Sequence, residues 1–131
     1  CLACHRLKNE GHAVGPDLAG IAGKPDEAIV LELLNPNDSI EPRYRSYTVV
    51  TTAGRIHIGM LASESATSVT LRRAKNMTDT ILRTQIESMT ASSVSLMPAN
   101  LYQQISPSDA ADLIGYLKQA LKPVDSTKRR R

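Results

Sequence analysis

Two short stretches on either side of a tight turn decide the fold of this chain: "YTVVTT", residues 47–52, and "RIHIGML", residues 55–61. In the second stretch every other residue is apolar, so these side chains lie on one face of an extended strand. Gly54 lies between the two stretches, and a glycine supplies the positive φ that a two-residue hairpin turn needs. The pattern therefore predicts an antiparallel β-hairpin. The residues expected to share the face are Ile56, Ile58 and Met60.

A second hairpin is expected directly after the first. "SVTLRR", residues 68–73, and "TILRTQI", residues 80–86, are rich in β-branched residues and flank the polar segment "AKNMTD". Together the two hairpins predict a small antiparallel sheet over about residues 46–88.

One helix is predicted before this sheet in the sequence and another after it. Pro25 begins the first, with acidic residues in its opening turn, and Asn35 and Pro36 end it. Ser106, Pro107 and Asp109 form the start signal of the last helix, whose apolar stripe ends before Pro123. The two expected apolar faces are Ile29, Val30, Leu33 and Leu34, and Ala110, Leu113, Ile114, Leu117 and Leu121. Residues 1–24 have no sustained period and are expected to form one short helix followed by loops.

Composition limits the chain to one domain and excludes two classes of partner. The 131 residues include four Tyr but no Phe or Trp, so the core is either aliphatic or completed by a large flat cofactor. The net charge is +3, part of it in a basic tail over residues 123–131, and no basic face with interleaved aromatic residues indicates nucleic-acid binding. No apolar run approaches the roughly 20 residues of a membrane span, so no transmembrane segment is expected. A chain that begins at a cysteine motif is expected to be a piece of a longer protein.

The first five residues, "CLACH", hold both cysteines of the chain and the first of its three histidines. On one helical turn Cys1 and Cys4 face the same side, at a spacing that suits thioether bonds to the two vinyl groups of a haem. His5 can then turn its imidazole towards the iron. The motif therefore predicts a covalently attached haem c with His5 as an iron ligand.

Three other interpretations of the motif remain open. A dithiol redox pair would belong to a βαβ unit, whereas the strands expected here form hairpins. A structural zinc site needs four ligands and usually a second cysteine pair, so His12 and His57 would have to complete it. The third interpretation is two buried structural cysteines beside a surface histidine.

A haem bound by one imidazole has a second axial position to fill. Met97 is favoured because it lies in the loop "SLMPANL", residues 95–101, which Pro98 fixes just before the last helix. The other three methionines fall in an expected strand, turn and strand end, where packing is the usual role of a methionine, and two histidines are further candidates. They are Met60, Met77, Met89, His12 and His57.

Four segments occur in the order found in class I cytochromes c, which the chain resembles. They are "CLACH", "GPDLAGI" at 15–21, "SLMP" at 95–98 and "DAADLIGYL" at 109–117. The resemblance is closer to a bacterial haem-binding (cytochrome c) domain found at the C-terminus of large exported multidomain proteins, some of them with dehydrogenase-like modules. In that family a segment like residues 33–61 also recurs. The resemblance extends from Cys1 to about Leu121.

The resemblance implies a set of cofactor contacts. It implies thioether links at Cys1 and Cys4 and iron ligation by His5 and Met97. It also implies that the carbonyl of Pro16 accepts a hydrogen bond from the other ring nitrogen of His5, and that Leu18 packs on the haem face.

The fold implied by the resemblance is α+β, a cytochrome c-like helical haem domain over residues 1–122 with the sheet of about 46–88 inserted in it. The sequence departs from the class I pattern through this insertion. It also lacks the helix that precedes CxxCH in that class and crosses the last helix near its aromatic residue, here Tyr116.

Ligation by His5 and Met97 would fill both axial positions, so we expect an electron carrier rather than an enzyme. The partner implied is a redox protein or a dehydrogenase domain of the parent chain. An alternative is a peroxidase-like or gas-binding enzyme with a displaceable Met97, and a third hypothesis is that the sheet docks another domain. Covalent haem attachment implies a periplasmic or otherwise extracytoplasmic location.

Overall fold

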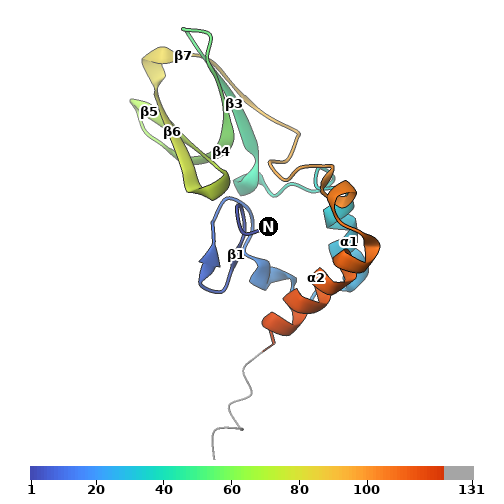
Figure 1. The fold of residues 1–131 in the computed structure, drawn as a ribbon. Helices are drawn as coiled ribbons and strands as arrows, with labels where there is room; N and C mark the ends of the chain where they lie inside the picture. The colour runs from blue at the N-terminus through green and yellow to red at the C-terminus, as the bar shows by residue number, and fades with distance from the viewer. Residues whose placement is uncertain (123–131) are drawn as a thin grey trace, which may run out of the picture.

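β-Strands are the most abundant kind of regular structure in the computed structural model, which describes residues 1–122 (Figure 1). Five strands form an antiparallel sheet in the order β6-β5-β4-β3-β7, and β1 and β2 form a separate two-stranded sheet. The strands are β1 Arg6–Leu7, β2 Glu10–Gly11, β3 Ser46–Thr51, β4 Ile56–Glu64, β5 Ser68–Arg73, β6 Met77–Leu82 and β7 Ile86–Ala91. Two α-helices occur within the described residues, α1 at Asp26–Leu34 and α2 at Pro107–Ala120.

The expected α+β fold, a cytochrome c-like helical domain with an inserted sheet, is therefore wrong. The five-stranded sheet is the largest element of the molecule, and its strands continue to Ala91. Residues 1–24 do not open with a helix: a turn is followed by the β1–β2 hairpin and a short 3-10 helix, η1, at Leu18–Ile21. The physical reason is that residues 46–91 supply most of the β-branched side chains that pack on one another, whereas only α2 carries a long apolar stripe.

The first predicted hairpin is confirmed. β3 and β4 pair antiparallel with Val49 opposite His57, and Gly54 adopts a φ of +77° in the turn. Arg55 closes this turn, because its carbonyl accepts from Thr51 N and its N–H donates to the Thr51 hydroxyl.

The second predicted hairpin is confirmed only in part. β5 and β6 do pair antiparallel, but β6 begins at Met77, in the segment expected to be the turn, and ends at Leu82. The turn is shorter because Lys75 and Asn76 adopt left-handed φ values of +60° and +58°. The chain then passes through one 3-10 turn and enters β7, which pairs with the free edge of β3. The stretch 80–86, predicted as one strand, is thus divided between β6 and β7, and β7 as a separate strand was not predicted.

The core lies on one face of the five-stranded sheet. Its centre is made by Val49, Val69, Leu71 and Ile81, all of which are at most 4% exposed. Each such side chain contributes about 1.5–3 kcal/mol relative to an exposed position. The partly buried residues that surround it are Tyr47, Leu61, Ile86 and Met89.

The helix predictions are confirmed in their positions. Ser106 caps α2, because its hydroxyl accepts from Asp109 N at 3.0 Å. The Asp109 carboxylate accepts from the Ser106 hydroxyl at 2.7 Å and from Ser106 N at 3.0 Å, and these two hydrogen bonds, the first more than the second, lower the pKa of Asp109. The expected stripe of α2 faces inward, with Ile114 and Leu117 buried. The face expected for α1 is wrong in part, because Ile29 is buried while Val30 and Leu34 stay at least 36% exposed.

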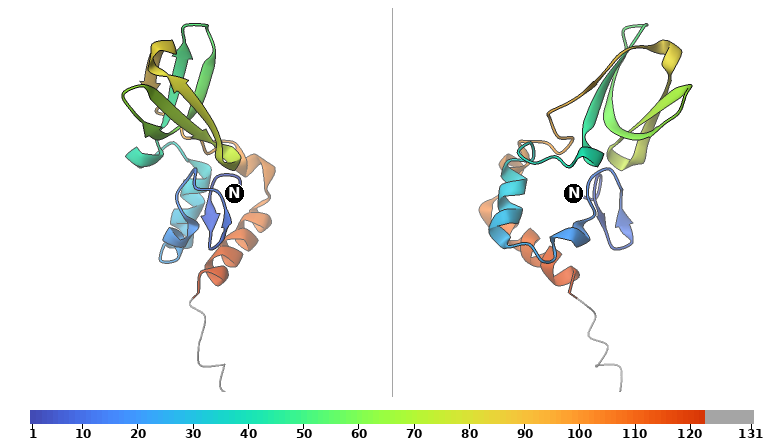
Figure 2. Two further views of the ribbon diagram at one scale, coloured as in Figure 1. Left: turned by 90° about the vertical axis from the view of Figure 1, so that its left-hand side faces the viewer. Right: turned by 180° about the vertical axis from the view of Figure 1, so that it is seen from behind.

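The N-terminal segment lies between the other parts of the molecule. In Figure 1 and in the rear view of Figure 2, the β1–β2 hairpin is on one side of the N-terminus, α1 and α2 are on the other, and the large sheet is above. An ion pair of Lys118 with Asp26 joins the two helices. The predicted basic tail, 123–131, lies outside the described residues. Among residues 1–122, none of the helices is both long enough and apolar enough to cross a membrane.

Candidate functional site

The CLACH segment forms a single hydrogen-bonded turn. Cys1 O accepts from Cys4 N at 3.0 Å and from His5 N at 2.9 Å, the bonding of one helical turn. A turn of this kind places residues three apart on the same side of the backbone. Both cysteines are free thiols, with Cys1 exposed and Cys4 half-buried. This single turn therefore places Cys1 and Cys4 on the same side of the backbone, as the predicted helix was expected to do.

Burial raises the pKa of the Cys4 thiol above its ordinary value. Cys4 is thus held as a neutral thiol at neutral pH. Redox-active and metal-binding cysteines need the thiolate and usually have a lowered pKa. The environment of Cys4 therefore counts against a dithiol redox pair.

A loop closes over the turn from residue 11 to residue 16. The carbonyl of Cys4 accepts from Val14 N at 2.9 Å and from Gly15 N at 2.7 Å, and the carbonyl of His5 accepts from His12 N at 3.2 Å. Gly11 passes so close that a Cβ built there would lie 2.1 Å from His5 O. Only a residue without a side chain fits this position.

The same loop orients the imidazole of His5. His5 Nδ1 lies 2.7 Å from Pro16 O, and because a carbonyl can only accept, Nδ1 carries the hydrogen. In the neutral ring the lone pair is then on Nε2. A Cβ on Gly15 would lie 2.7 Å from His5 Cε1, so the ring packs flat against the backbone at this point. The hydrogen bond that the resemblance implied is present.

Leu18 and Met97, the other two residues expected at the haem, make no hydrogen bond to the CLACH turn within residues 1–122. Leu18 begins η1, is half-buried, and follows Asp17, whose carboxylate accepts from Ala19 N at 2.8 Å. Met97 is half-buried in the loop after β7, and its N–H donates to the hydroxyl of Ser95. Ser95 in turn donates its N–H to Asn37, which ties this loop to the segment after α1. Among residues 1–122, no hydrogen bond joins Met97 to the CLACH turn.

Sequence reasoning missed the contact of the large sheet with the turn. Lys75, between β5 and β6, donates its N–H to Ala3 O at 2.6 Å, and Arg72 Nη1 lies 3.4 Å from Ala13 O. A backbone donor is present at almost every position of a chain, so no residue pattern announces such a contact. The left-handed pair at 75 and 76 could have been suspected from Asn76 alone, since Asn tolerates this conformation.

His57, the candidate distal residue of the enzyme alternative, is engaged elsewhere. Its Nδ1 lies 3.6 Å from the carboxylate of Asp79, which also pairs with Arg73 Nε at 3.1 Å. The hydrogen bond from Arg73 lowers the pKa of Asp79, and the nearby ring of His57 acts in the same direction. The three residues belong to the adjacent strands β4, β5 and β6, and their mutual contacts are a sufficient structural role for His57.

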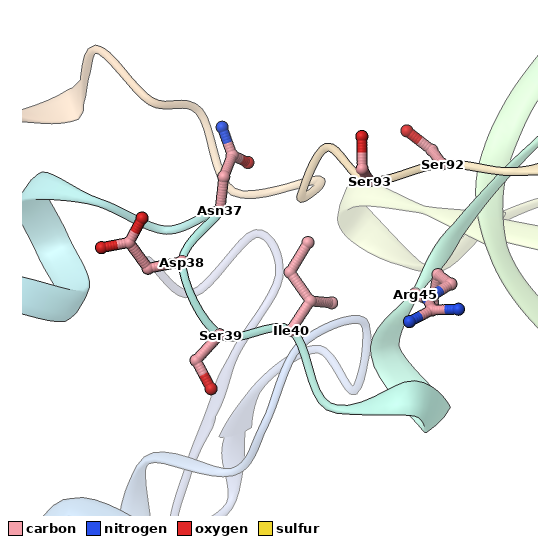
Figure 3. Close-up of a pocket in the computed structure, with 7 residues that line it drawn as sticks. All are labelled: Asn37, Asp38, Ser39, Ile40, Arg45, Ser92 and Ser93. Atoms are coloured by element: carbon pink, nitrogen blue, oxygen red, sulfur yellow. The ribbon is translucent and has the colours of Figure 1, made fainter.

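A polar pocket of about 400 Å³ lies between residues 37–45 and 92–93 (Figure 3). Its side chains point in different directions: Ser39 points away from Ser92 and Ser93, and Arg45 stands apart from Asp38. Asn37 already uses its carbonyl oxygen for Ser95 N. The pocket therefore lacks the converging polar groups of a ligand site.

Tyr116 remains largely uncovered. It is 62% exposed and lines a second hollow of about 240 Å³ with the turn of the β1–β2 hairpin. The β1–β2 hairpin therefore lies beside α2 at Tyr116.

Comparisons with protein-family models and with curated proteins find no match to this chain. The assignment of the site therefore depends on its own chemistry. Within residues 1–122, no three His, Cys, Asp or Glu side chains are grouped to share a metal ion. The donor set does fit a c-type haem, because two unpaired thiols lie on one turn next to an imidazole whose Nε2 is free to bind iron.

Proposed function

We propose that this chain attaches a haem covalently at Cys1 and Cys4 and transfers electrons through it. The observation that carries the proposal is the hydrogen bond from His5 Nδ1 to Pro16 O, next to two free thiols on one turn. Histidines that bind metals commonly donate their second ring nitrogen to a carbonyl or carboxylate in this way. A surface histidine of structural origin needs no such orientation.

Each of the polar residues of the CLACH turn has its own role in this proposal. Cys1 and Cys4 each add a thiol to a vinyl group, so that the thiol proton goes to one vinyl carbon and sulfur bonds the other. The raised pKa of Cys4 keeps its thiol protonated before this addition. His5 would hold the haem iron through Nε2, and Pro16 O raises the basicity of the ring by accepting from Nδ1.

Met97 is proposed as the second axial ligand. It is the methionine that the resemblance implies, and it lies half-buried in a loop anchored through Ser95. The bound haem would supply a one-electron couple, which thioether ligation shifts to higher potential. With both axial positions filled by side chains, a substrate has no position on the iron, which favours electron transfer over catalysis.

The partner proposed is a redox protein or a dehydrogenase domain of the same parent chain, and the location proposed is periplasmic or otherwise extracytoplasmic. Haem is attached to thiols on the export side of the membrane, which supports this location. The position of His57, with its Nδ1 3.6 Å from the Asp79 carboxylate, speaks against its use as a distal acid or base in a peroxidase-like enzyme.

Covalent attachment is tested by exporting the chain in a host that attaches haem c and staining a denaturing gel for haem. The parent should keep its colour on the gel, and the double variant Cys1→Ala, Cys4→Ala should lose it. A parent band without colour, at a normal protein level, would remove the proposal.

The second ligand is tested by the absorption spectrum of the ferric form. Methionine ligation gives a weak charge-transfer band at the red end of the visible range, which should disappear in Met97→Ala and persist in Met77→Ala. If the band is missing in the parent while the haem is attached, Met97 is not a ligand, and binding of an external ligand to the iron should then be measured.

A further inference from the structure

The turn between β5 and β6 is built into the CLACH site. Figure 1 shows this turn directly above the N-terminal segment, where Lys75 N donates to Ala3 O at 2.6 Å. Lys75 can do so because its backbone is left-handed, with a φ of +60°, and Asn76 follows with +58°. Two consecutive non-glycine residues in this conformation are uncommon and mark a backbone that the surrounding contacts hold in place.

Arg72, at the end of β5, contacts the loop that orients His5. Its Nη1 lies 3.4 Å from Ala13 O, and its Nε is buried without a hydrogen-bond partner among the described residues. Ala13 directly precedes Val14 and Gly15, whose N–H groups bind Cys4 O. Arg72 therefore braces the loop at the point where it turns towards Pro16.

The charge of Arg72 is also not neutralised by a nearby carboxylate. Among residues 1–122, ion pairs join Arg43 to Glu41, Arg73 to Asp79 and Arg83 to Glu64. Arg72 has no such ion pair within the same part of the chain. Partial burial of a cation without a counter-ion lowers the stability of the fold, unless a nearby group is stabilised by the positive charge.

We propose that Arg72 is a positioning residue of the haem site: it braces the loop that holds the imidazole of His5, and its charge raises the reduction potential of the iron. This inference rests on the proposed function. A fixed positive charge destabilises ferric iron more than ferrous iron, because ferric iron carries the larger positive charge. The reduction potential is therefore raised. The five-stranded sheet thereby becomes part of the redox site and not only a neighbour of it.

The test compares holoproteins that carry Arg72→Met, Arg72→Lys or Arg55→Met. Arg55→Met is the matched control, because it removes the same charge as Arg72→Met does. Arg55 is exposed and lies in the β3–β4 turn. Arg72→Met should favour oxidation by about tenfold, which for a one-electron couple is about 59 mV. Arg72→Lys should keep most of the parent potential, and Arg55→Met should shift it much less than Arg72→Met does.

A second measurement needs no haem. In the haem-free chain, hydrogen exchange at the amides of Val14 and Gly15 should be faster in Arg72→Met than in the parent and in Arg55→Met. If the parent stains for haem but Arg72→Met keeps both the potential and the exchange rates, the role of Arg72 is refuted and the proposed function stands. If the parent does not stain, the proposed function fails, and unchanged exchange would also remove the bracing role. Should Arg72→Met fail to fold, Arg72→Gln replaces it in both measurements.

Discussion

The imidazole of His5 is held by the backbone carbonyl of Pro16, which lies eleven residues further along the chain and 2.7 Å from Nδ1. The acceptor is a main-chain atom, so the orientation of the ring depends on the path of the loop and not on the identity of one side chain. The loop path depends in turn on two close approaches, of Gly11 to His5 O and of Gly15 to the ring. The steric requirement for glycine is therefore the most direct way to test whether this geometry matters.

Gly15→Ala should displace the imidazole of His5. The added Cβ would lie 2.7 Å from Cε1 and 3.0 Å from Nδ1, so either the ring or the loop must move and the bond to Pro16 O weakens. The nitrogen chemical shifts of the His5 ring report its tautomer, and they should move towards those of a free histidine. Gly20→Ala is the control, because no atom lies within 4 Å of a Cβ built there. Equal ring shifts in the two variants would contradict the prediction.

Cys4 should react with an alkylating reagent more slowly than Cys1. Its pKa is raised by burial and its side chain is only partly accessible, so at neutral pH little thiolate is present. Mass spectrometry of the haem-free chain, sampled over time with iodoacetamide, measures the two rates. Denaturation should make the rates similar, and similar rates in the native chain would show that Cys4 is not shielded.

Local signals made part of the fold predictable. Gly54 announces the β3–β4 hairpin because its positive φ of +77° is a property of the turn itself. Ser106 and Asp109 announce the start of α2 because the cap is formed within four consecutive residues. In each case the residues that signal the element are also those that make its hydrogen bonds.

The non-local parts of the fold were not predictable in the same way. β7 forms because β3 has a second edge to fill, and the pairing of Thr48 with Thr90 has no signature in either strand. The overall class was wrong because the order of motifs resembles a helical family, whereas packing around Leu71 makes the sheet the main element. At the candidate site, the CLACH residues were evident from sequence, but the contact of Lys75 with Ala3 depends on a backbone donor alone.

Leu71→Ala should destabilise the protein by about 2–5 kcal/mol, because the removed atoms leave a cavity in a well-packed core. Leu71 is 1% exposed and packs with Val49, Val69 and Ile81. Urea unfolding followed by circular dichroism gives the free energy of unfolding. Ile56→Ala is the control, since Ile56 is 64% exposed and should lose less than about 1 kcal/mol. A loss below about 1 kcal/mol at Leu71 would mean that this face of the sheet is not the core.

Asp79→Asn should destabilise the protein at neutral pH but hardly at all in acid. The hydrogen bond from Arg73, with a smaller effect of the nearby His57, lowers the pKa of Asp79 in the folded state below the unfolded value of 3.8. A lowered folded pKa means that the stabilisation is complete above pH 3.8 and is lost as the pH falls through the folded value. The loss at pH 7 should be about 0.5–1 kcal/mol, the usual range for a partly exposed ion pair.

The measurement for Asp79→Asn is the free energy of unfolding of parent and variant at pH 7 and at a series of lower pH values, because the pairing of Asp79 with Arg73 weakens as the parent carboxyl takes up its proton. Asp38→Asn serves as the control, because Asp38 is exposed and takes part in no ion pair within residues 1–122. A difference between parent and Asp79→Asn that stays constant with pH would show that the amide disturbs packing at the edge of the core. The pH dependence thus separates the ionic role of Asp79 between three strands from a steric one.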